Sequence, residues 1–231
     1  LFVHGISSAG YADILSAPGR PFFNRTLLAG YEPGSTIKPF IGLAGLEMGL
    51  VNDSDEVFSG GEYYLPNVSR HYRDWKRGGH GSVNIYEALE ESVNSYFYQL
   101  ALDLGIDRMH GYLARFGFGT PTGIDLLGES SGVLPSREWK RARFDLPWYP
   151  GETVIAGIGQ GFNVVTPLQL ANALSTLVNG GTRREPRLLY ASKSAGDRQA
   201  ARNGSPLAAQ MPVVDPVNWD IVREGMRLVV H

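Results

Sequence analysis

The chain has 231 residues, of which 43% are hydrophobic and 19% charged, and its formal net charge at pH 7 is −2. This composition excludes a disordered or collagen-like chain and provides enough apolar residues for a hydrophobic core in one or two domains. A net charge near zero gives no electrostatic support for binding to nucleic acid or to an anionic membrane surface. The absence of cysteine excludes disulfides, thiol catalysis and cysteine-bound zinc.

The two ends of the sequence indicate a piece of a longer chain. It opens on Leu1 rather than on methionine, and it closes on an apolar run that ends at His231. We therefore expect truncation at both ends, so that a signal peptide or an anchor helix could precede Leu1. The sequence itself contains no run of about 18 apolar residues that would span a membrane.

The first half of the chain is expected to alternate between helices and loops. After a loop-rich start, apolar residues on all sides of residues 35–50 predict a buried helix. Residues 51–81 are polar and rich in glycine and aromatic residues, which favours a long surface excursion. Helical periodicity returns over 85–104 and stops at Gly105, but residues 92–95 interrupt it with types that favour helix caps.

The second half is expected to be mainly helical as well. Further helices are predicted over residues 107–116, from 135, from 166 to 180 and from 215. Thr166 is the expected N-cap of the longest of these, with Pro167 in its first turn and Gln169 completing a capping box. Residues 191–210 are rich in Ser, Ala, Arg and Gly, which predicts a mobile loop. The best candidate strands are residues 153–156 and 187–190.

The sharpest chemical motif places Ser35 three residues before Lys38 at the start of the predicted buried helix. This spacing puts a hydroxyl and an amine on one helix face. A serine hydroxyl needs a neighbouring base to become nucleophilic, and a lysine removed from water can have a pKa low enough to serve. An N-cap serine followed by a solvated lysine is the simpler interpretation of such a pair. The apolar surroundings of Lys38 favour the serine–lysine acyl-transfer interpretation instead.

A second segment should supply a relaying hydroxyl and an amide, and the sequence offers two Ser-x-Asn triplets. Residues 82–84 lie between a glycine-rich loop and a helix, where Asn84 is a natural N-cap. Residues 92–94 instead break an otherwise continuous helical pattern, and such local conflicts are expected at functional sites. We therefore select Ser92 and Asn94.

Several stretches together resemble one protein family. Residues 31–39, which contain Ser35 and Lys38, resemble the nucleophile motif of the class B penicillin-binding proteins. A narrower resemblance, to the rod-shape transpeptidases of the penicillin-binding protein 2 type, is carried by residues 73–76, 79–81, 88–99, 123–126, 135–140 and 157–161. The glycines of the last stretch are expected to let the backbone pass close to the wall of the active site.

The resemblance implies a peptidoglycan D,D-transpeptidase that cross-links stem peptides during cell elongation. Ser35 would be the acylated nucleophile and Lys38 its proton acceptor, Ser92 would relay protons to the leaving amine, and Asn94 would orient Lys38 and the substrate amide. β-Lactams would acylate Ser35 in place of the D-Ala-D-Ala donor. A serine β-lactamase, a D,D-carboxypeptidase and a non-catalytic β-lactam-sensing domain remain as alternatives.

The implied fold is α+β, of the penicillin-binding and serine β-lactamase type. In this family a third motif, Lys-Thr/Ser-Gly, lies on a strand that helps to form the oxyanion hole. The only similar stretch, residues 193–196, falls in the predicted mobile loop and lacks the required glycine. By family order the third motif would follow His231, and most of the central antiparallel sheet would lie outside this chain. Because the third motif is absent, the resemblance implies no catalytic activity for this chain on its own.

Some close relatives in the family hold zinc beside the active site through two Asp, one His and one Cys. Asp74 and His80 match two of these ligands, but Ser59 and Val93 stand at the positions of the other two. Two ligands do not make a structural zinc site. We therefore expect no metal and no other cofactor, with Asp74 and His80 hydrogen-bonded within residues 51–81.

The resemblance also implies a place in the cell and a set of partners. The catalytic domain would face the periplasm of a bacterium, anchored in the inner membrane by a segment outside this sequence. Its partners would be peptidoglycan stem peptides, β-lactams, and a glycosyltransferase and a scaffold protein of the elongation machinery, with no nucleic acid.

Overall fold

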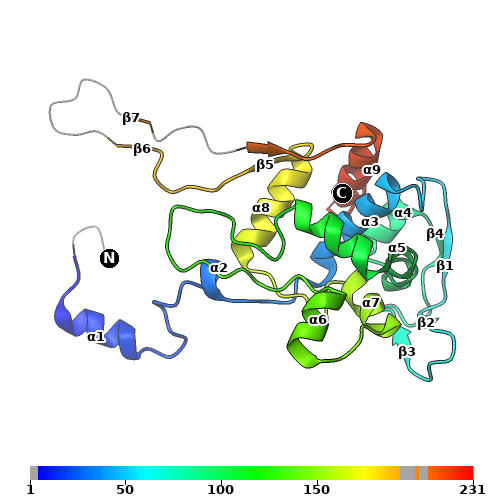
Figure 1. Cartoon of the computed structure of the whole chain (residues 1–231), viewed down its shortest axis with the longest axis horizontal. Helices are drawn as coiled ribbons and strands as arrows, with labels where there is room; N and C mark the ends of the chain where they lie inside the picture. Colours follow the sequence, from blue (N-terminus) through cyan, green and yellow to red (C-terminus); the bar gives the residue numbers. More distant parts are fainter. Residues whose placement is uncertain (1–4, 193–200, 203–207, 231) are drawn as a thin grey trace.

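The computed structural model describes residues 5–192, 201–202 and 208–230. Its helices are α1 (Ser8–Ser16), α2 (Arg25–Leu28), the 3-10 helix η1 (Gly34–Ile37), α3 (Lys38–Glu47), α4 (Ile85–Glu90), α5 (Asn94–Arg115), α6 (Arg137–Phe144), α7 (Pro150–Gly157), α8 (Pro167–Val178) and α9 (Pro216–Leu228). Its strands are β1 (Val57–Ser59), β2 (Glu62–Tyr64), β3 (His71–Arg73), β4 (Gly81–Val83), β5 (Thr182–Arg184), β6 (Ala191–Ser192), β7 (Ala201–Arg202) and β8 (Ala208–Gln210). In Figure 1 most helices form one body around α3 and α5, while α1 lies apart from it.

Helix α3 lies at the centre of this body and is covered by α4, α5 and α9. Lys38 and every residue from Phe40 to Glu47 are buried. A helix that is apolar on all sides can be stable in water only when other elements surround it. The predicted buried helix is thus confirmed, except that its first turn is the tighter 3-10 helix η1 and its α-helical part ends at Glu47.

The periodic segment that follows residue 84 forms α4 and α5, with a short turn between them at residues 91–93. The predicted stop at Gly105 is confirmed: with φ 70° and ψ 157° its backbone is not helical, and α5 consists of two helical stretches that meet there in a kink. The second stretch, which ends at Arg115, corresponds to the helix predicted over residues 107–116. Helix α5 packs against α3 on one side and α7 on another, which makes it the second central element.

In the described residues every sheet has two antiparallel strands. Strand β1 pairs with β4 and β2 pairs with β3, so the segment predicted as a surface excursion is a nested β-ribbon. Strands β5 and β8 form another pair, and β6 and β7 a fourth. Helices dominate and the sheets are small, as expected for an α+β chain that lacks most of a central sheet.

Both candidate strands were wrong. Residues 153–156 belong to helix α7, because Pro150 suits the first helical turn and the Glu152 carboxylate accepts a hydrogen bond from the Tyr149 N–H at 2.8 Å. Residues 187–190 form no strand. The N–H groups of Leu188 and Leu189 donate instead to the Asp125 carboxylate at 2.7 and 2.9 Å.

The starts of three other helices, α6, α8 and α9, depend on local capping and were predicted correctly. The hydroxyls of Ser136 and Thr166 accept from the N–H of Trp139 and Gln169, and Asp215 accepts from the N–H of Val217. The central part of the predicted mobile loop, residues 193–200 and 203–207, lies outside the described residues, so that prediction stays untested.

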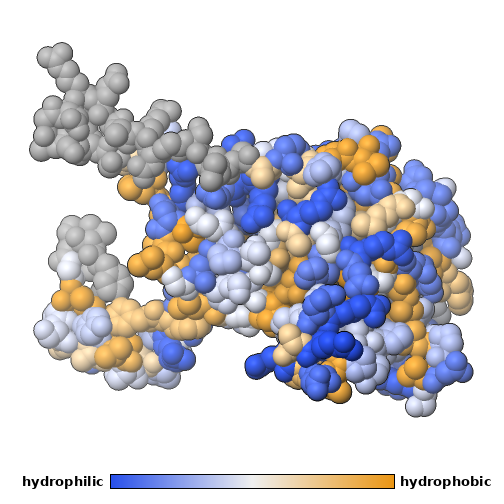
Figure 2. All heavy atoms as spheres, in the orientation of Figure 1, coloured by the Kyte–Doolittle hydropathy of each residue, from blue (hydrophilic) through white to orange (hydrophobic). Residues whose placement is uncertain are grey.

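The surface is uneven in polarity. Figure 2 shows hydrophilic side chains over α6 and apolar ones along the segment that joins α1 to α2. Among the described helices, none is long and apolar enough to cross a membrane.

Candidate active site

Ser35 and Lys38 lie where η1 passes into α3, on the wall of a cavity of about 220 Å³. Residues of η1, α3, α4, the turn after α4 and the C-terminal end of α9 complete the wall: Thr36, Pro39, Leu89, Glu90, Ser92, Met226 and Val229. The Ser35 hydroxyl belongs to an exposed residue, whereas Lys38 is 1% exposed. A nucleophile within reach of solvent therefore stands beside a buried amine.

The Lys38 ammonium is held by the selected Ser-x-Asn triplet. Its Nζ donates to the Ser92 carbonyl oxygen at 2.7 Å, to the Ser92 hydroxyl at 3.0 Å and to Asn94 Oδ1 at 2.7 Å. The structure thus brings three of the four predicted site residues into direct contact. The fourth, Ser35, lines the same cavity, and its hydroxyl has no hydrogen-bond partner among the described residues.

The environment of Lys38 disfavours its charged form. Burial lowers the pKa of Lys38 from the ordinary 10.5 to about 7, although the nearby Asp74 carboxylate acts in the opposite direction. The Phe97 ring, whose centre lies 5.4 Å from Nζ, likewise favours the charged form, so burial is the effect that dominates. An amine with a pKa near neutrality is partly unprotonated at pH 7 and can accept a proton.

The turn that carries Ser92 has an unusual backbone conformation. Ser92 has φ 54°, in the left-handed region that side chains other than glycine rarely adopt. Its N–H donates to the Leu89 carbonyl at 3.3 Å, and the Val93 N–H donates to the Ala88 carbonyl at 2.9 Å. These bonds close the end of α4 and direct both the carbonyl and the hydroxyl of Ser92 toward Lys38. The other triplet is different: Asn84 caps α4, as expected.

The glycine-rich stretch 157–161 supports the turn before Ser35. The Gly34 N–H donates to the Gly159 carbonyl at 2.9 Å, and the Gly161 N–H donates to Glu32 Oε1 at 2.8 Å. A Cβ atom at residue 159 would collide with the Gly34 carbonyl oxygen. The expectation that these glycines allow a close backbone approach at the wall of the site is confirmed.

Sequence reasoning missed a polar network next to the turn that carries Ser92. The Asp74 carboxylate accepts from the Ser95 N–H at 2.9 Å and from the Ser95 hydroxyl at 3.0 Å. The Ser95 hydroxyl also lies 2.6 Å from the hydroxyl of Ser59. As expected, Asp74 and His80 have partners within residues 51–81: Asp74 Oδ1 accepts from the Trp75 N–H at 2.8 Å and lies 3.4 Å from His80 Nε2. Both also reach outside that segment, Asp74 to Ser95 of α5 and His80 to Glu91 at 2.9 Å. The lack of a capping side chain at Val93 was the one sequence signal that α5 needs a distant cap.

The zinc site considered from the family resemblance does not fit these residues. Both Asp74 oxygens already accept backbone N–H groups, of Trp75 and of Ser95. Ser59 offers a hydroxyl in place of a carboxylate, and Val93 offers no donor atom. Among the described residues there is no group of three or more His, Cys, Asp or Glu side chains suited to a metal ion.

Comparison with known proteins identifies the family. The model of the penicillin binding protein transpeptidase domain matches residues 7–231. The chain belongs to this family. It is 40% identical to the peptidoglycan D,D-transpeptidase MrdA of Escherichia coli (strain K12) over 232 aligned positions, which cover 98% of this chain and 35% of that protein. The chain therefore spans about a third of the length of this curated relative.

Solved structures of the family share the fold. The crystal structure of Pseudomonas aeruginosa PBP2 in complex with WCK 5153 matches with a TM-score of 0.86 and 45% identity, over 98% of this chain and 50% of that one. The complex between PBP2 and MreC from Helicobacter pylori contains a chain that matches with a TM-score of 0.85 and 30% identity, over 98% of this chain and 40% of that one. The penicillin-binding transpeptidase fold predicted from the sequence is confirmed.

Proposed function

We propose that this chain carries part of the active site of a peptidoglycan D,D-transpeptidase that works through a serine acyl-enzyme. The observation that carries the proposal is the buried Lys38 amine, which Ser92 and Asn94 hold on the wall of the cavity that Ser35 also lines. The similarity to MrdA supports the same activity, since that relative is a peptidoglycan D,D-transpeptidase.

Each of the four residues has a distinct proposed task. Neutral Lys38 accepts the Ser35 proton while the hydroxyl attacks the carbonyl carbon of the penultimate D-Ala, and D-Ala leaves. Ser92, hydrogen-bonded to Lys38, passes a proton to the leaving amine. Asn94 fixes Lys38 through Oδ1 and, in this proposal, orients the substrate amide. An amine of a neighbouring stem peptide then attacks the ester and regenerates Ser35.

The proposed setting follows from relatives rather than from this chain. PBP2 of Helicobacter pylori has been solved in complex with MreC, and a related chain belongs to a peptidoglycan synthase complex that coordinates polymerization and crosslinking. We infer a similar scaffold protein and a similar polymerising partner here. An inner-membrane anchor and a periplasmic catalytic domain complete the proposal.

The decisive experiment uses the intact natural protein with a labelled penicillin. Intact-mass analysis should show one covalent adduct, and Ser35→Ala should abolish it while Ser82→Ala, in the other Ser-x-Asn triplet, should retain it. An adduct that persists in Ser35→Ala would refute the assignment of the nucleophile. Rapid hydrolysis of the adduct would instead indicate a β-lactamase or carboxypeptidase. A stable adduct without cross-linking of stem peptides would indicate a sensor.

A further inference from the structure

Helix α5 begins at the active site without a capping side chain of its own. Val93, at its N-cap position, is aliphatic and fully buried. The N–H groups of the first helical turn need acceptors when they are buried. Asp74, whose carboxylate is 0% exposed, supplies one by accepting from the Ser95 N–H at 2.9 Å. A residue 21 positions earlier in the chain therefore caps the helix that carries Asn94.

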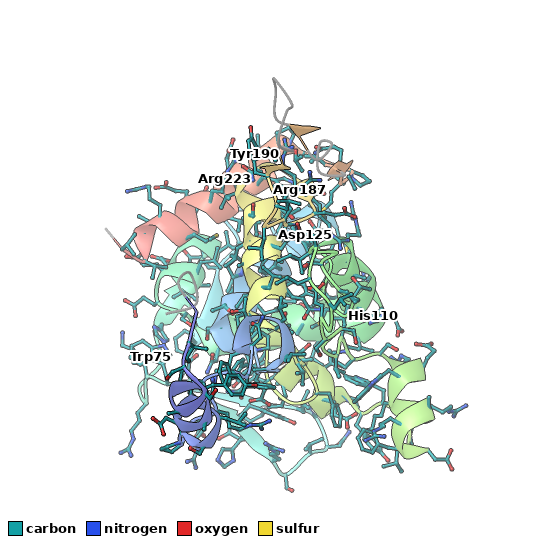
Figure 3. The ribbon with its side chains drawn as sticks, turned by 90° about the vertical axis from the view of Figure 1, so that its left-hand side faces the viewer. Trp75, His110, Asp125, Arg187, Tyr190 and Arg223 are labelled. Carbon is teal, nitrogen blue, oxygen red and sulfur yellow. The ribbon has the colours of Figure 1, made fainter. Side chains whose placement is uncertain are left out.

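Residues 74–80, which connect β3 to β4 and include Asp74, also bind Glu91, the residue that precedes Ser92. The imidazole of His80 is 2% exposed and lies between two carboxylates, with Nε2 3.4 Å from Asp74 and Nδ1 2.9 Å from Glu91. The Trp75 indole N–H donates to the Glu91 carbonyl at 2.8 Å. Residues immediately before Ser92 and immediately after Asn94 are thus both attached to the β-ribbon, and Figure 3 shows Trp75 at the edge of the molecule where this attachment is made.

We propose that Asp74, His80 and Glu91 form a metal-free clamp that positions Ser92 and Asn94 around the Lys38 amine. These three are positioning residues, because none of them lines the cavity shared by Ser35 and Lys38. The clamp acts on the acylation step and therefore rests on the proposed transpeptidase function.

The physical reason for a clamp is the strained turn itself. Ser92 has φ 54°, and such a conformation in a residue other than glycine persists only when its surroundings enforce it. Bonds on one side alone would leave the turn free to relax about Val93. Bonds from one rigid segment to both sides fix the Ser92 carbonyl and hydroxyl at 2.7 and 3.0 Å from Lys38 Nζ.

Loss of the clamp should slow acylation rather than weaken binding of the penicillin. A displacement of about 1 Å in a catalytic group can cost about 10²-fold in rate. We expect His80→Ala to lower the acylation rate constant about 10²-fold, with the dissociation constant of the initial penicillin complex unchanged. His80→Asn should recover part of the rate, because its amide nitrogen can replace the Nδ1 donor to Glu91.

The test measures acylation of the intact natural protein by stopped-flow mixing with a fluorescent penicillin. Glu91→Ala is the second variant, and it should fold as the parent does because the side chain of Glu91 is 47% exposed. Its acylation should also be slow. The control is His110→Ala, which loses a hydrogen bond between a ring nitrogen and the Pro135 carbonyl oxygen at 3.1 Å. Figure 3 places His110 on the opposite side of the molecule from Trp75, so this variant should acylate at the parent rate.

Three results would overturn the clamp. The first is an unchanged acylation rate constant in both His80→Ala and Glu91→Ala. The second is an equal loss in the His110→Ala control, which would indicate general destabilisation. The third is a loss of acylation when the parent protein is treated with a zinc chelator, because the clamp needs no ion. A parent protein that forms no adduct at all would instead refute the proposed function.

Discussion

The charge of Lys38 should control the rate at which Ser35 is acylated, and Asn94→Asp changes that charge directly. The pKa of Lys38 is lowered to about 7, chiefly by burial. Its neutral form accepts the proton, so the acylation rate should rise with pH through about 7 and then reach a plateau. Between pH 6 and pH 8 the neutral fraction, and with it the rate, should increase about tenfold.

Asn94→Asp places a carboxylate where an amide oxygen now lies 2.7 Å from the Lys38 amine. An opposite charge this close favours the ammonium and raises the pKa of the lysine by about 1 to 3 units. At pH 7 the neutral fraction would then fall from about one half to between about 10% and 0.1%. We therefore expect acylation at pH 7 to slow by about 5- to 500-fold, with much of the loss recovered at higher pH.

The assay is the acylation rate constant of a fluorescent penicillin, measured from about pH 5.5 to about pH 9.5 on parent and variant. Asn84→Asp is the matched control, since Asn84 only caps α4 and aspartate is an equally good N-cap. Its profile should match that of the parent. The reasoning fails if the Asn94→Asp profile keeps its midpoint near pH 7, or if Asn84→Asp shifts as far.

Two further predictions concern elements that support the site. Gly159→Ala should slow acylation and lower the free energy of unfolding by more than about 2 kcal/mol, because φ is 72° and the new Cβ meets the Gly34 carbonyl oxygen. Gly180→Ala, where φ is 63° and the space is open, should cost only about 1 kcal/mol in denaturant titration and leave acylation unchanged. Glu47→Ala should cost about 3 kcal/mol without moving the pH profile, because Glu47 accepts from Trp219 Nε1 at 3.2 Å and from backbone N–H groups before α9.

The sequence predicted three helix starts whose cause is local. A capping side chain and the N–H that it accepts lie two or three residues apart, so the starts of α6, α8 and α9 could be identified without tertiary information. The stretch 153–156 was misassigned because its β-branched residues favour strands in isolation. The local signals for a helix, Pro150 in the first turn and the capping box of Tyr149 and Glu152, lie just before that stretch, and packing of α7 against α5 adds a contact that no short window of sequence contains.

In the candidate site, too, some residues can be identified from a local sequence pattern and others only from the fold. Ser92 and Asn94 could be selected because they interrupt a helical pattern, and both contact Lys38. Asp74 could not be selected in this way, since it breaks no periodicity and its partner Ser95 lies 21 positions further along the chain. A buried cap supplied from a distant segment requires the fold to be known first.

The hydrogen bonds around Lys38 give Ser92 a role that Asn94 cannot share. Three acceptors surround Nζ: the Ser92 carbonyl, the Ser92 hydroxyl and Asn94 Oδ1. An ammonium can donate to all three, but a neutral amine has two N–H groups and a lone pair that needs a donor. Only the hydroxyl can reverse its direction and donate to Nζ, whereas the two carbonyl-type oxygens can only accept. Because a buried lone pair without a donor is costly, the Ser92 hydroxyl stabilises the neutral lysine before the Ser35 hydroxyl donates to Nζ in its place. Once Nζ has taken the Ser35 proton, the Ser92 hydroxyl accepts from Nζ again and can donate its own proton to the leaving amine, as the proposed relay requires.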